Sequence, residues 1–346
     1  MNKQVALVGA TGLVGRELLC LLEGREFPVA RLALFGSPRQ PDRRLLFRSE
    51  PLPVRPLSPG CFRGIELAFF ATPAAVAETW VPEARGAGSL VIDHSSAYRS
   101  DPEVPLVVPE VNGETLSNHQ GLVANPNCST ILLVLVLAPL HRMASLRQVV
   151  VATYQAVSGA GQAAVLELEK QLLDRRTPRR APRRDHGEAR PAEEPIGGVF
   201  EQEIALNLIP AIGPGQPSQF TGEERKIQDE SRRILNLGNL AISATCVRVP
   251  VLRVHSEAVH VGLSRPVSIE RVRRELSRAP GLSVLDDPAL GLYPTPRRAE
   301  GLDQVLVGRI RQDPALDPGV ALFLSGDQLR KGAALNAVQI AEMAFA

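Results

Sequence analysis

Short apolar runs and amphipathic stretches alternate along the first part of the chain. The apolar runs, each of a length typical of a buried strand, occupy residues 5–8, 31–35, 67–71 and 90–93. Patterns with helical spacing follow the first run, up to Leu22, and the third run, over residues 74–87. Strands that are buried on both faces of a parallel sheet have such continuous apolar sequences, and helices connect them. The pattern therefore predicts an α/β fold with a Rossmann-like, doubly wound parallel sheet.

The spacing changes beyond the apolar run at residues 131–140, which has the length of a helix. Strand-like runs follow at residues 147–154, 242–251, 253–259, 305–310 and 320–324. Helical patterns lie at residues 221–235 and 331–341. We expect a Rossmann domain of residues 1–130, completed by a carboxy-terminal segment 327–346, and an α+β domain of residues 131–326.

The composition excludes several classes of protein. The 346 residues, of which 44% are hydrophobic and 22% charged, suffice for a large core and for more than one domain. A net charge of +2 and few aromatic residues argue against nucleic acid as a partner. The chain starts without the pattern of a signal peptide, and its longest apolar run is too short to cross a membrane. We therefore expect a cytoplasmic protein without a membrane partner.

Two local features of the composition narrow the function further. The four cysteines and six histidines show no metal-ligand or redox spacing, which predicts neither a metal site nor a disulfide framework. Residues 175–190 are rich in arginine and proline and have no periodicity. This composition is typical of a solvent-exposed loop without regular structure, and nucleic-acid binding is the alternative.

A glycine-rich turn joins the first predicted strand to the first predicted helix. Residues 9–15, with the sequence GATGLVG, place glycines at Gly9, Gly12 and Gly15. Glycines at such a turn let the backbone approach a pyrophosphate, which then lies at the N-terminus of the helix. The turn therefore predicts a dinucleotide site, and a tight turn without a ligand is the alternative.

The residues after the second predicted strand distinguish between two dinucleotides. An acidic residue at this place binds the ribose 2′-hydroxyl of NAD, whereas a cation favours the 2′-phosphate of NADP. This chain has Ser37 and Arg39, and no acidic residue before Asp42. The sequence therefore favours NADP, unless Arg39 is only a solvated loop residue.

Cys128 stands where the apolar helix is predicted to begin, with Ser129 and Thr130 in the first turn. The positive end of the helix dipole and the unpaired N–H groups lower the pKa of a thiol at this position and favour the nucleophilic thiolate. The same N–H groups can stabilise an oxyanion. We predict that Cys128 is a nucleophile, and a buried, inert cysteine is the alternative.

Other side chains suit a catalytic cysteine. Arg99 follows the last apolar run of the sheet, on a loop where a cation can bind phosphate. In the predicted strand 242–251, alternation places Arg248 on the same face as Cys246. A guanidinium on an apolar face needs an anion as its partner. His255, with an ordinary pKa near neutrality, is a candidate acid/base or a structural histidine. Glu223 and Lys226, three residues apart, form either an ion pair or a grip on a zwitterion.

Taken together, several motifs resemble the aspartate-β-semialdehyde dehydrogenase family. They are GATGLVG at 9–15, SSAYR at 95–99, NPNCST at 125–130, YQAVSGAG at 154–161, RVPV at 248–251 and HSE at 255–257. Their order and spacing cover nearly the whole chain. The sequence differs from the usual family pattern at His94, at residues 71–73 and at Gln328. The resemblance implies a homodimer whose second domain supplies the interface.

The resemblance also implies roles for individual residues. Cys128 would be the nucleophile, Gln155 would orient the substrate, and His255 would be the general acid/base. The substrate would be bound by Arg248 at its carboxylate, by Glu223 at its amino group, and by Arg99 and Lys226 at its phosphate. The cofactor contacts would come from Gly9, Thr11, Gly12, Leu13, Val14, Ser37, Arg39, Ser158, Gly159 and Gln328.

The reaction that the resemblance implies is the NADPH-dependent reductive dephosphorylation of 4-phospho-L-aspartate to L-aspartate-4-semialdehyde and phosphate, through a cysteine thioester. This step belongs to lysine, diaminopimelate, threonine and methionine biosynthesis. Two alternatives are an inactive paralog that binds a dinucleotide and an enzyme of the N-acetyl-glutamyl-phosphate reductase type. The complete catalytic set argues against the first. Arg248 together with Glu223 and Lys226 favours a small zwitterionic substrate over the second.

Overall fold

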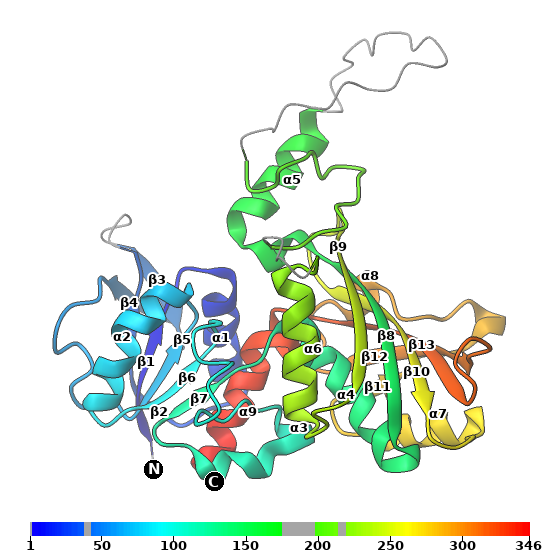
Figure 1. Cartoon of the computed structure of the whole chain (residues 1–346). Coiled ribbons are helices and arrows are strands. Elements are labelled where there is room, and N and C mark those ends of the chain that lie inside the picture. Colours follow the sequence, from blue (N-terminus) through cyan, green and yellow to red (C-terminus); the bar gives the residue numbers. More distant parts are fainter. Residues whose placement is uncertain (1, 38–42, 175–197, 214–218) are drawn as a thin grey trace.

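The computed structural model describes residues 2–37, 43–174, 198–213 and 219–346, which are arranged around two β-sheets (Figure 1). Arg39 and the arginine-rich residues 175–190 lie outside the described residues. The predictions for these two places therefore concern parts of the chain that the structure does not describe.

The first sheet is the parallel sheet that the amino-terminal pattern predicts. Its strands are β1 (Lys3–Val8), β2 (Val29–Phe35), β3 (Arg44–Phe47), β4 (Glu50–Arg55), β5 (Leu67–Phe70), β6 (Leu90–Asp93) and β7 (Leu122–Ala124). Their order is β3-β4-β2-β1-β5-β6-β7, and all neighbours are parallel except β3 and β4. The winding reverses between β1 and β5, and ligands of doubly wound sheets bind beyond the strand ends at such a point.

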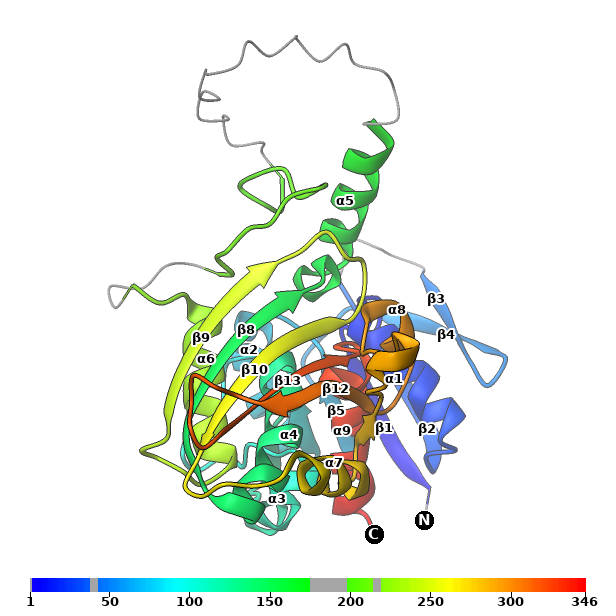
Figure 2. The same cartoon turned by 90° about the vertical axis from the view of Figure 1, so that its right-hand side faces the viewer.

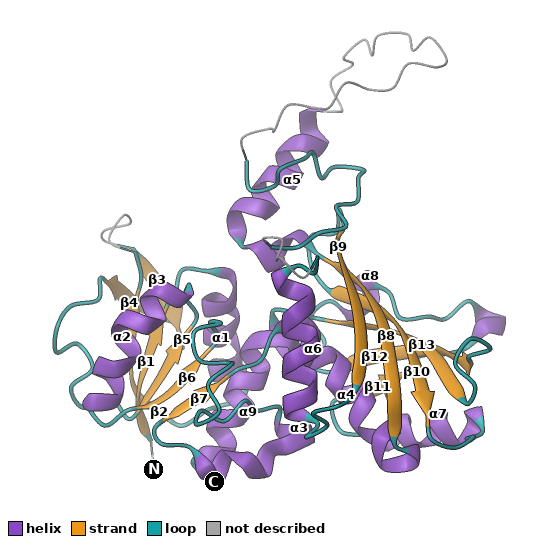
Figure 3. Cartoon of the chain, viewed as in Figure 1, coloured by secondary structure: helices purple, strands orange, loops and turns teal. Residues whose placement is uncertain are grey.

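Helices from both ends of the chain pack on the first sheet. They are α1 (Leu13–Gly24), α2 (Ala74–Gly86) and α9 (Leu335–Ala344), which a π-helical turn (Arg330–Ala334) precedes. The short α3 (Pro109–Asn112) and a 3-10 helix (Gly113–Asn118) contact α9. Leu335 and Val338 share one apolar core with Leu7 of β1 and Leu18 of α1. The carboxy-terminal segment thus returns to the amino-terminal sheet (Figure 3).

The second sheet has mixed strand directions. Its strands are β8 (Leu146–Gln155), β9 (Ala241–Arg248), β10 (His255–Leu263), β11 (Leu282–Val284), β12 (Val305–Gln312) and β13 (Gly319–Gly326). The order is β11-β12-β13-β10-β8-β9, in which β8 runs parallel to β9 and antiparallel to β10. Alternate residues of β9 are buried, so Cys246 and Arg248 share the inner face, as strand alternation predicts. The fold class of a Rossmann-like sheet with an α+β domain is confirmed.

Helices cover one face of the second sheet. They are α4 (Cys128–Ala144), α6 (Gly222–Ile234) and α7 (Ile269–Arg278). Helix α4 is apolar around most of its circumference and nearly all of it is buried, as expected for a helix between other layers. On the opposite face, which faces the viewer in Figure 2, the short α8 (Pro296–Ala299) packs against Leu306 of β12, and no described helix covers β8 and β10. Helix α5 (Gln162–Asp174) projects away from both sheets.

Some elements were absent from the sequence-based prediction. The β3-β4 hairpin carries Pro51 and Pro53 and several charged residues, which obscure a strand pattern. Strands β7 and β11 have only three residues each, too few for a periodicity to be recognised. In the described ranges, no helix combines the length and apolarity needed to cross a membrane.

Candidate active site

Cys128 is the first residue of α4, where the sequence predicts the helix to begin. Asn127 caps the helix, because its Oδ1 accepts hydrogen bonds from the N–H groups of Ser129 (3.0 Å) and Thr130 (3.2 Å). The π-helical turn near the carboxy-terminus passes close to the thiol, since a Cβ atom on Gly332 would lie 3.2 Å from the Cβ of Cys128. The nucleophile candidate therefore lies where both sheets and the carboxy-terminal segment meet.

A cavity of about 500 Å³ surrounds Cys128. The predicted site residues that line it are Val14, Arg99, Cys128, Gln155, Ser158, Gly159, Glu223, Lys226, Arg248, His255 and Gln328. Of the remaining predicted residues, Gly9, Thr11 and Gly12 belong to the turn before α1, Leu13 is the first residue of α1, and Ser37 follows β2 on the surface. The structure thus gathers the predicted catalytic and substrate-binding residues around one cavity.

His255, at the start of β10, is held by the loop that contains Ser158 and Gly159. The Ala156 N–H donates to its Nδ1 (3.0 Å), so the neutral ring carries its proton on Nε2. A Cβ atom on Gly159 would lie 3.1 Å from Nε2, which explains why a glycine stands there. Burial, followed by the charge of Arg248, lowers the pKa of His255 to about 3. The prediction that the pKa of His255 lies near neutrality is therefore wrong.

Gln155 and Glu223 connect the two sides of the cavity. Gln155, at the end of β8, donates through Nε2 to Ser129 Oγ (2.5 Å) and to Glu223 Oε1 (3.2 Å). Asn127 Nδ2 donates to the same Glu223 oxygen (2.8 Å). Lys226 pairs with Glu223 Oε2 (3.1 Å), so the ion pair that is one of the two sequence interpretations is present. Burial raises the pKa of Glu223, but Lys226 and the hydrogen bonds outweigh burial, and its pKa is lowered.

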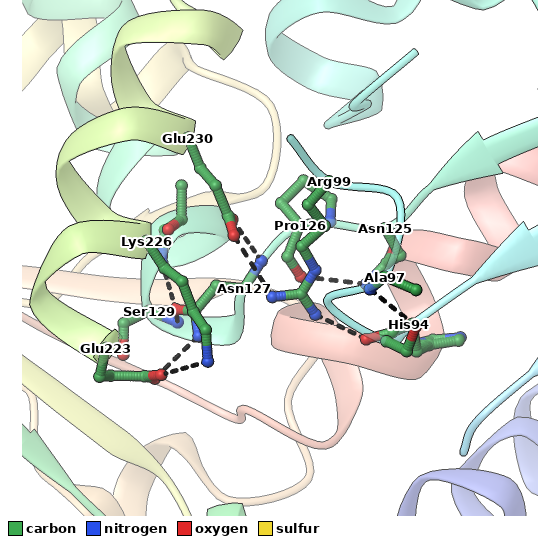
Figure 4. Close-up of polar contacts among 12 residues, drawn as sticks. His94, Ala97, Arg99, Asn125, Pro126, Asn127, Ser129, Glu223, Lys226 and Glu230 are labelled. Atoms are coloured by element: carbon green, nitrogen blue, oxygen red, sulfur yellow. Dashed lines mark hydrogen bonds and ion pairs between the residues drawn. The ribbon is translucent and has the colours of Figure 1, made fainter. Parts of the chain in front are cut away.

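Arg99 and Arg248 both line the cavity and come from different parts of the chain. Arg248, at the end of β9, donates through Nη1 to the Ala156 carbonyl (2.7 Å). Arg99 donates through Nη2 to the His94 carbonyl (2.6 Å) and pairs with Glu230 (3.3 Å), as Figure 4 shows. Two arginines that line one cavity with a thiol can hold a substrate with two anionic groups.

The pKa of the Cys128 thiol is raised, contrary to the prediction from its helix position. Burial is the main cause and the charge of Glu223 adds to it, so that the pKa of Cys128 reaches about 12. Arg99, Arg248 and the Ser129 N–H act in the opposite direction without offsetting these effects. The N–H groups of Ser129 and Thr130 both donate to Asn127 Oδ1, and the use of backbone N–H groups at this helix start for an oxyanion stays a prediction.

The turn before α1 fits a dinucleotide. Gly9 has φ +87°, and a Cβ atom there would lie 2.2 Å from the Ala71 carbonyl oxygen, so only glycine is accommodated. Gly12 caps α1 without a side-chain hydrogen bond, which keeps the first N–H groups of the helix available for a pyrophosphate. Across the cavity, Gln328 donates to Ser158 Oγ (2.6 Å) and accepts from the Val254 N–H (2.6 Å). These contacts fix the two cofactor candidates Gln328 and Ser158 to each other.

Comparisons with known proteins agree over nearly the whole chain. Residues 4–119 match the family model described as semialdehyde dehydrogenase, NAD binding domain, and residues 137–331 match semialdehyde dehydrogenase, dimerisation domain. The chain is 44% identical to the aspartate-semialdehyde dehydrogenase of Synechocystis, over 98% of this chain and 96% of that protein. The chain belongs to the aspartate-semialdehyde dehydrogenase family. It is therefore an enzyme with a nucleotide-binding domain.

Two crystal structures of aspartate semialdehyde dehydrogenase II from Vibrio cholerae have a similar fold. The first has a TM-score of 0.92 and 37% identity, and covers 100% of this chain and 99% of its own. The second, complexed with ASA, has a TM-score of 0.91 and 37% identity, with 100% and 98% covered. The inactive paralog and the N-acetyl-glutamyl-phosphate reductase alternative both have less support than the aspartate-semialdehyde dehydrogenase family.

Sequence reasoning missed several residues of this aspartate-semialdehyde dehydrogenase site. Asn127 lies inside a recognised motif, and its position before Cys128 is a sequence signal for a helix cap. Glu230 gives no such signal, because its contacts with Arg99 and Asn127 depend on how α6 packs. Thr72 and His94 also line the cavity, and their side-chain polar atoms are buried without a hydrogen-bond partner among the described residues.

Replacing Glu223 should make Cys128 more reactive. In Glu223→Gln the amide oxygen still accepts hydrogen bonds, but the negative charge that raises the pKa of Cys128 is removed. We expect alkylation of Cys128 by iodoacetamide at pH 8 to become roughly three to ten times faster. Peptide mass spectrometry measures the rate, with the exposed Cys20 in the same chain as the reference thiol. An unchanged or slower rate at Cys128 would contradict the electrostatic account.

Proposed function

We propose that this enzyme catalyses the NADPH-dependent reductive dephosphorylation of 4-phospho-L-aspartate to L-aspartate-4-semialdehyde and phosphate. The observation that carries the proposal is one cavity in which the Cys128 thiol lies with Arg99 and Lys226, with Arg248 and with His255. Membership of the family and the ASA complex of the Vibrio cholerae relative support the same substrate. The step would serve lysine, diaminopimelate, threonine and methionine biosynthesis in the cytoplasm.

We infer that charged side chains select the substrate. The Arg248 guanidinium suits the α-carboxylate, because its fork of N–H groups matches a carboxylate geometrically. Glu223 is a buried carboxylate with a lowered pKa, so it remains charged and suits the α-amino group. Arg99 and Lys226 supply two separate cations for the phosphoryl group. This assignment leaves the 4-acyl carbon of the substrate for Cys128.

The proposed chemistry begins with attack of the Cys128 sulfur on the acyl phosphate. The C–S bond forms and the C–O bond to phosphate breaks. The proton of the thiol is transferred to the released phosphate. NADPH, when bound, supplies the hydride that reduces the thioester. His255 presents the proton on Nε2 to the oxygen that becomes negative, since Ala156 already occupies Nδ1. The C–S bond then breaks as the aldehyde carbonyl forms, Arg99 and Arg248 stabilise the returning thiolate, and a proton from solvent restores the thiol.

NADP is the proposed dinucleotide. Its proposed binding site also divides the chain into a nucleotide-binding domain and a second domain. Ser37, Arg39 and the absence of an acidic residue between the end of the second strand and Asp42 favour the 2′-phosphate. We propose that residues 1–130 with 327–346 bind NADP through the glycine turn and Gln328. Residues 131–326 would supply the remaining catalytic side chains and the interface of a homodimer.

Loss of the Cys128 thiol should abolish turnover. We expect Cys128→Ala to reduce phosphate-dependent oxidation of L-aspartate-4-semialdehyde by ~10³-fold or more, because no nucleophile remains to form the thioester. Formation of NADPH at 340 nm measures the rate, and Cys20→Ala, which changes an exposed thiol, is the matched control. Retained turnover in Cys128→Ala would exclude the thioester mechanism. A higher kcat/KM with NAD than with NADP would exclude the proposed role of Arg39.

The proposed dimer interface is the part of the second sheet, over β8 and β10, that no described helix covers. Val150 and Tyr154 of β8 are exposed there, although both are apolar or aromatic. We expect Val150→Glu to convert a dimer into a monomer, since it places a charge within the buried interface. Sedimentation analysis measures the mass, and Leu46→Glu, which alters an exposed apolar residue of the β3-β4 hairpin, should leave the dimer intact. A dimeric Val150→Glu variant would contradict this assignment.

A further inference from the structure

Both cations of the proposed phosphate site already have a carboxylate partner within the protein. Arg99 pairs with Glu230 (3.3 Å), and Lys226 pairs with Glu223 (3.1 Å). The two pairs differ in exposure: the Lys226 side chain is 38% exposed, whereas those of Arg99 and Glu230 are 13% and 6% exposed. Water screens the Arg99–Glu230 pair less than the Lys226–Glu223 pair. Glu230 therefore has a larger electrostatic effect on Arg99 than Glu223 has on Lys226.

Glu230 occupies a fixed position between Arg99 and the turn that leads to Cys128. Its Oε2 accepts the backbone N–H of Asn127 (2.6 Å), while its Oε1 faces Arg99. Figure 4 shows the carboxylate of Glu230 reaching from α6 towards both groups, on the same side of the helix as Lys226. The carboxylate is therefore held by the backbone as well as by the guanidinium, and it cannot swing away from Arg99 without losing a buried hydrogen bond.

Arg99 retains unused capacity for an anion. Its Nη2 donates to the His94 carbonyl (2.6 Å) and its Nη1 to Glu230. Its Nε is buried and has no hydrogen-bond partner among the described residues. A guanidinium with an unsatisfied buried N–H can donate to a further anionic partner while its two other contacts persist. A phosphate bound at Arg99 would then lie near the charge of Glu230.

We propose that Glu230 is a built-in counter-charge that limits the affinity of the Arg99 site for phosphate. The carboxylate holds the guanidinium in position and at the same time repels the phosphate that binds beside it. This inference rests on the proposed function, in which phosphate is the leaving group and must depart after each turnover. Arg99 and Lys226 without counter-charges would bind the released phosphate more tightly, which would slow its departure.

Charge removal at Glu230 tests the proposal. In Glu230→Gln the amide oxygen can still accept the Asn127 N–H, but the negative charge is lost. We expect the KM for phosphate in semialdehyde oxidation to fall roughly three- to tenfold, with the KM for NADP unchanged. Asp229→Asn is the matched control, because it removes a charge from the neighbouring residue of α6, whose side chain is 69% exposed. A KM for phosphate that is unchanged or raised in Glu230→Gln overturns the proposal.

A second pair of variants tests the same proposal after Arg99 itself has been removed, so that no arginine is left without its carboxylate partner. Arg99→Gln leaves the buried Glu230 unpaired, so phosphate binding should weaken both through loss of attraction and through repulsion. We expect the double variant Arg99→Gln/Glu230→Gln to have a lower KM for phosphate than Arg99→Gln. A purely structural role of Glu230 predicts no such recovery, and its absence overturns the proposal. Wild-type enzyme without phosphate-dependent activity would instead refute the proposed function itself.

Discussion

The active-site arrangement depends on Asn127, which caps α4 and connects it to α6. Its Oδ1 accepts the N–H groups of Ser129 and Thr130, its Nδ2 donates to Glu223, and its backbone N–H donates to Glu230. The helix start is buried, where an N–H group without a partner costs about 1–3 kcal/mol. Asn127 therefore allows the helix to begin there, fixes Cys128 at its first position, and connects it to Glu223 and Glu230.

The cavity combines neutral reactive groups with charged groups that are already paired. Burial keeps the Cys128 thiol protonated and the His255 ring neutral, while Arg99 and Lys226 face Glu230 and Glu223. A dry site with uncompensated charges would be costly to form. In the proposed reaction the substrate supplies a carboxylate for Arg248, a phosphate for Arg99 and Lys226 and an ammonium for Glu223. Binding thus adds substrate groups to charged side chains that already have partners, around a thiol that is held in place.

The sequence was informative where a local pattern decides the structure. Continuous apolar runs predicted the parallel sheet, and the polar residues before residues 131–140 predicted the start of α4 at Cys128. The family motifs correctly grouped Gln155, Arg248 and His255 around one cavity. Glu230 escaped prediction because it lies 131 residues from Arg99, and only the packing of α6 brings them together. The pKa of Cys128 was predicted in the wrong direction, because burial raises it more than the helix N-terminus lowers it. The sequence does not show how deeply a single sulfur atom is buried.

The central claim is that the Cys128 sulfur becomes acylated by the substrate. The most direct measurement is peptide mass spectrometry after the enzyme is mixed with L-aspartate-4-semialdehyde and NADP in the absence of phosphate and then quenched in acid. The account predicts an aspartyl thioester on the peptide that contains Cys128, and its rapid loss when phosphate is added before quenching. An enzyme that turns over normally with phosphate but shows no acyl adduct on Cys128, or shows one on another cysteine, would contradict the account.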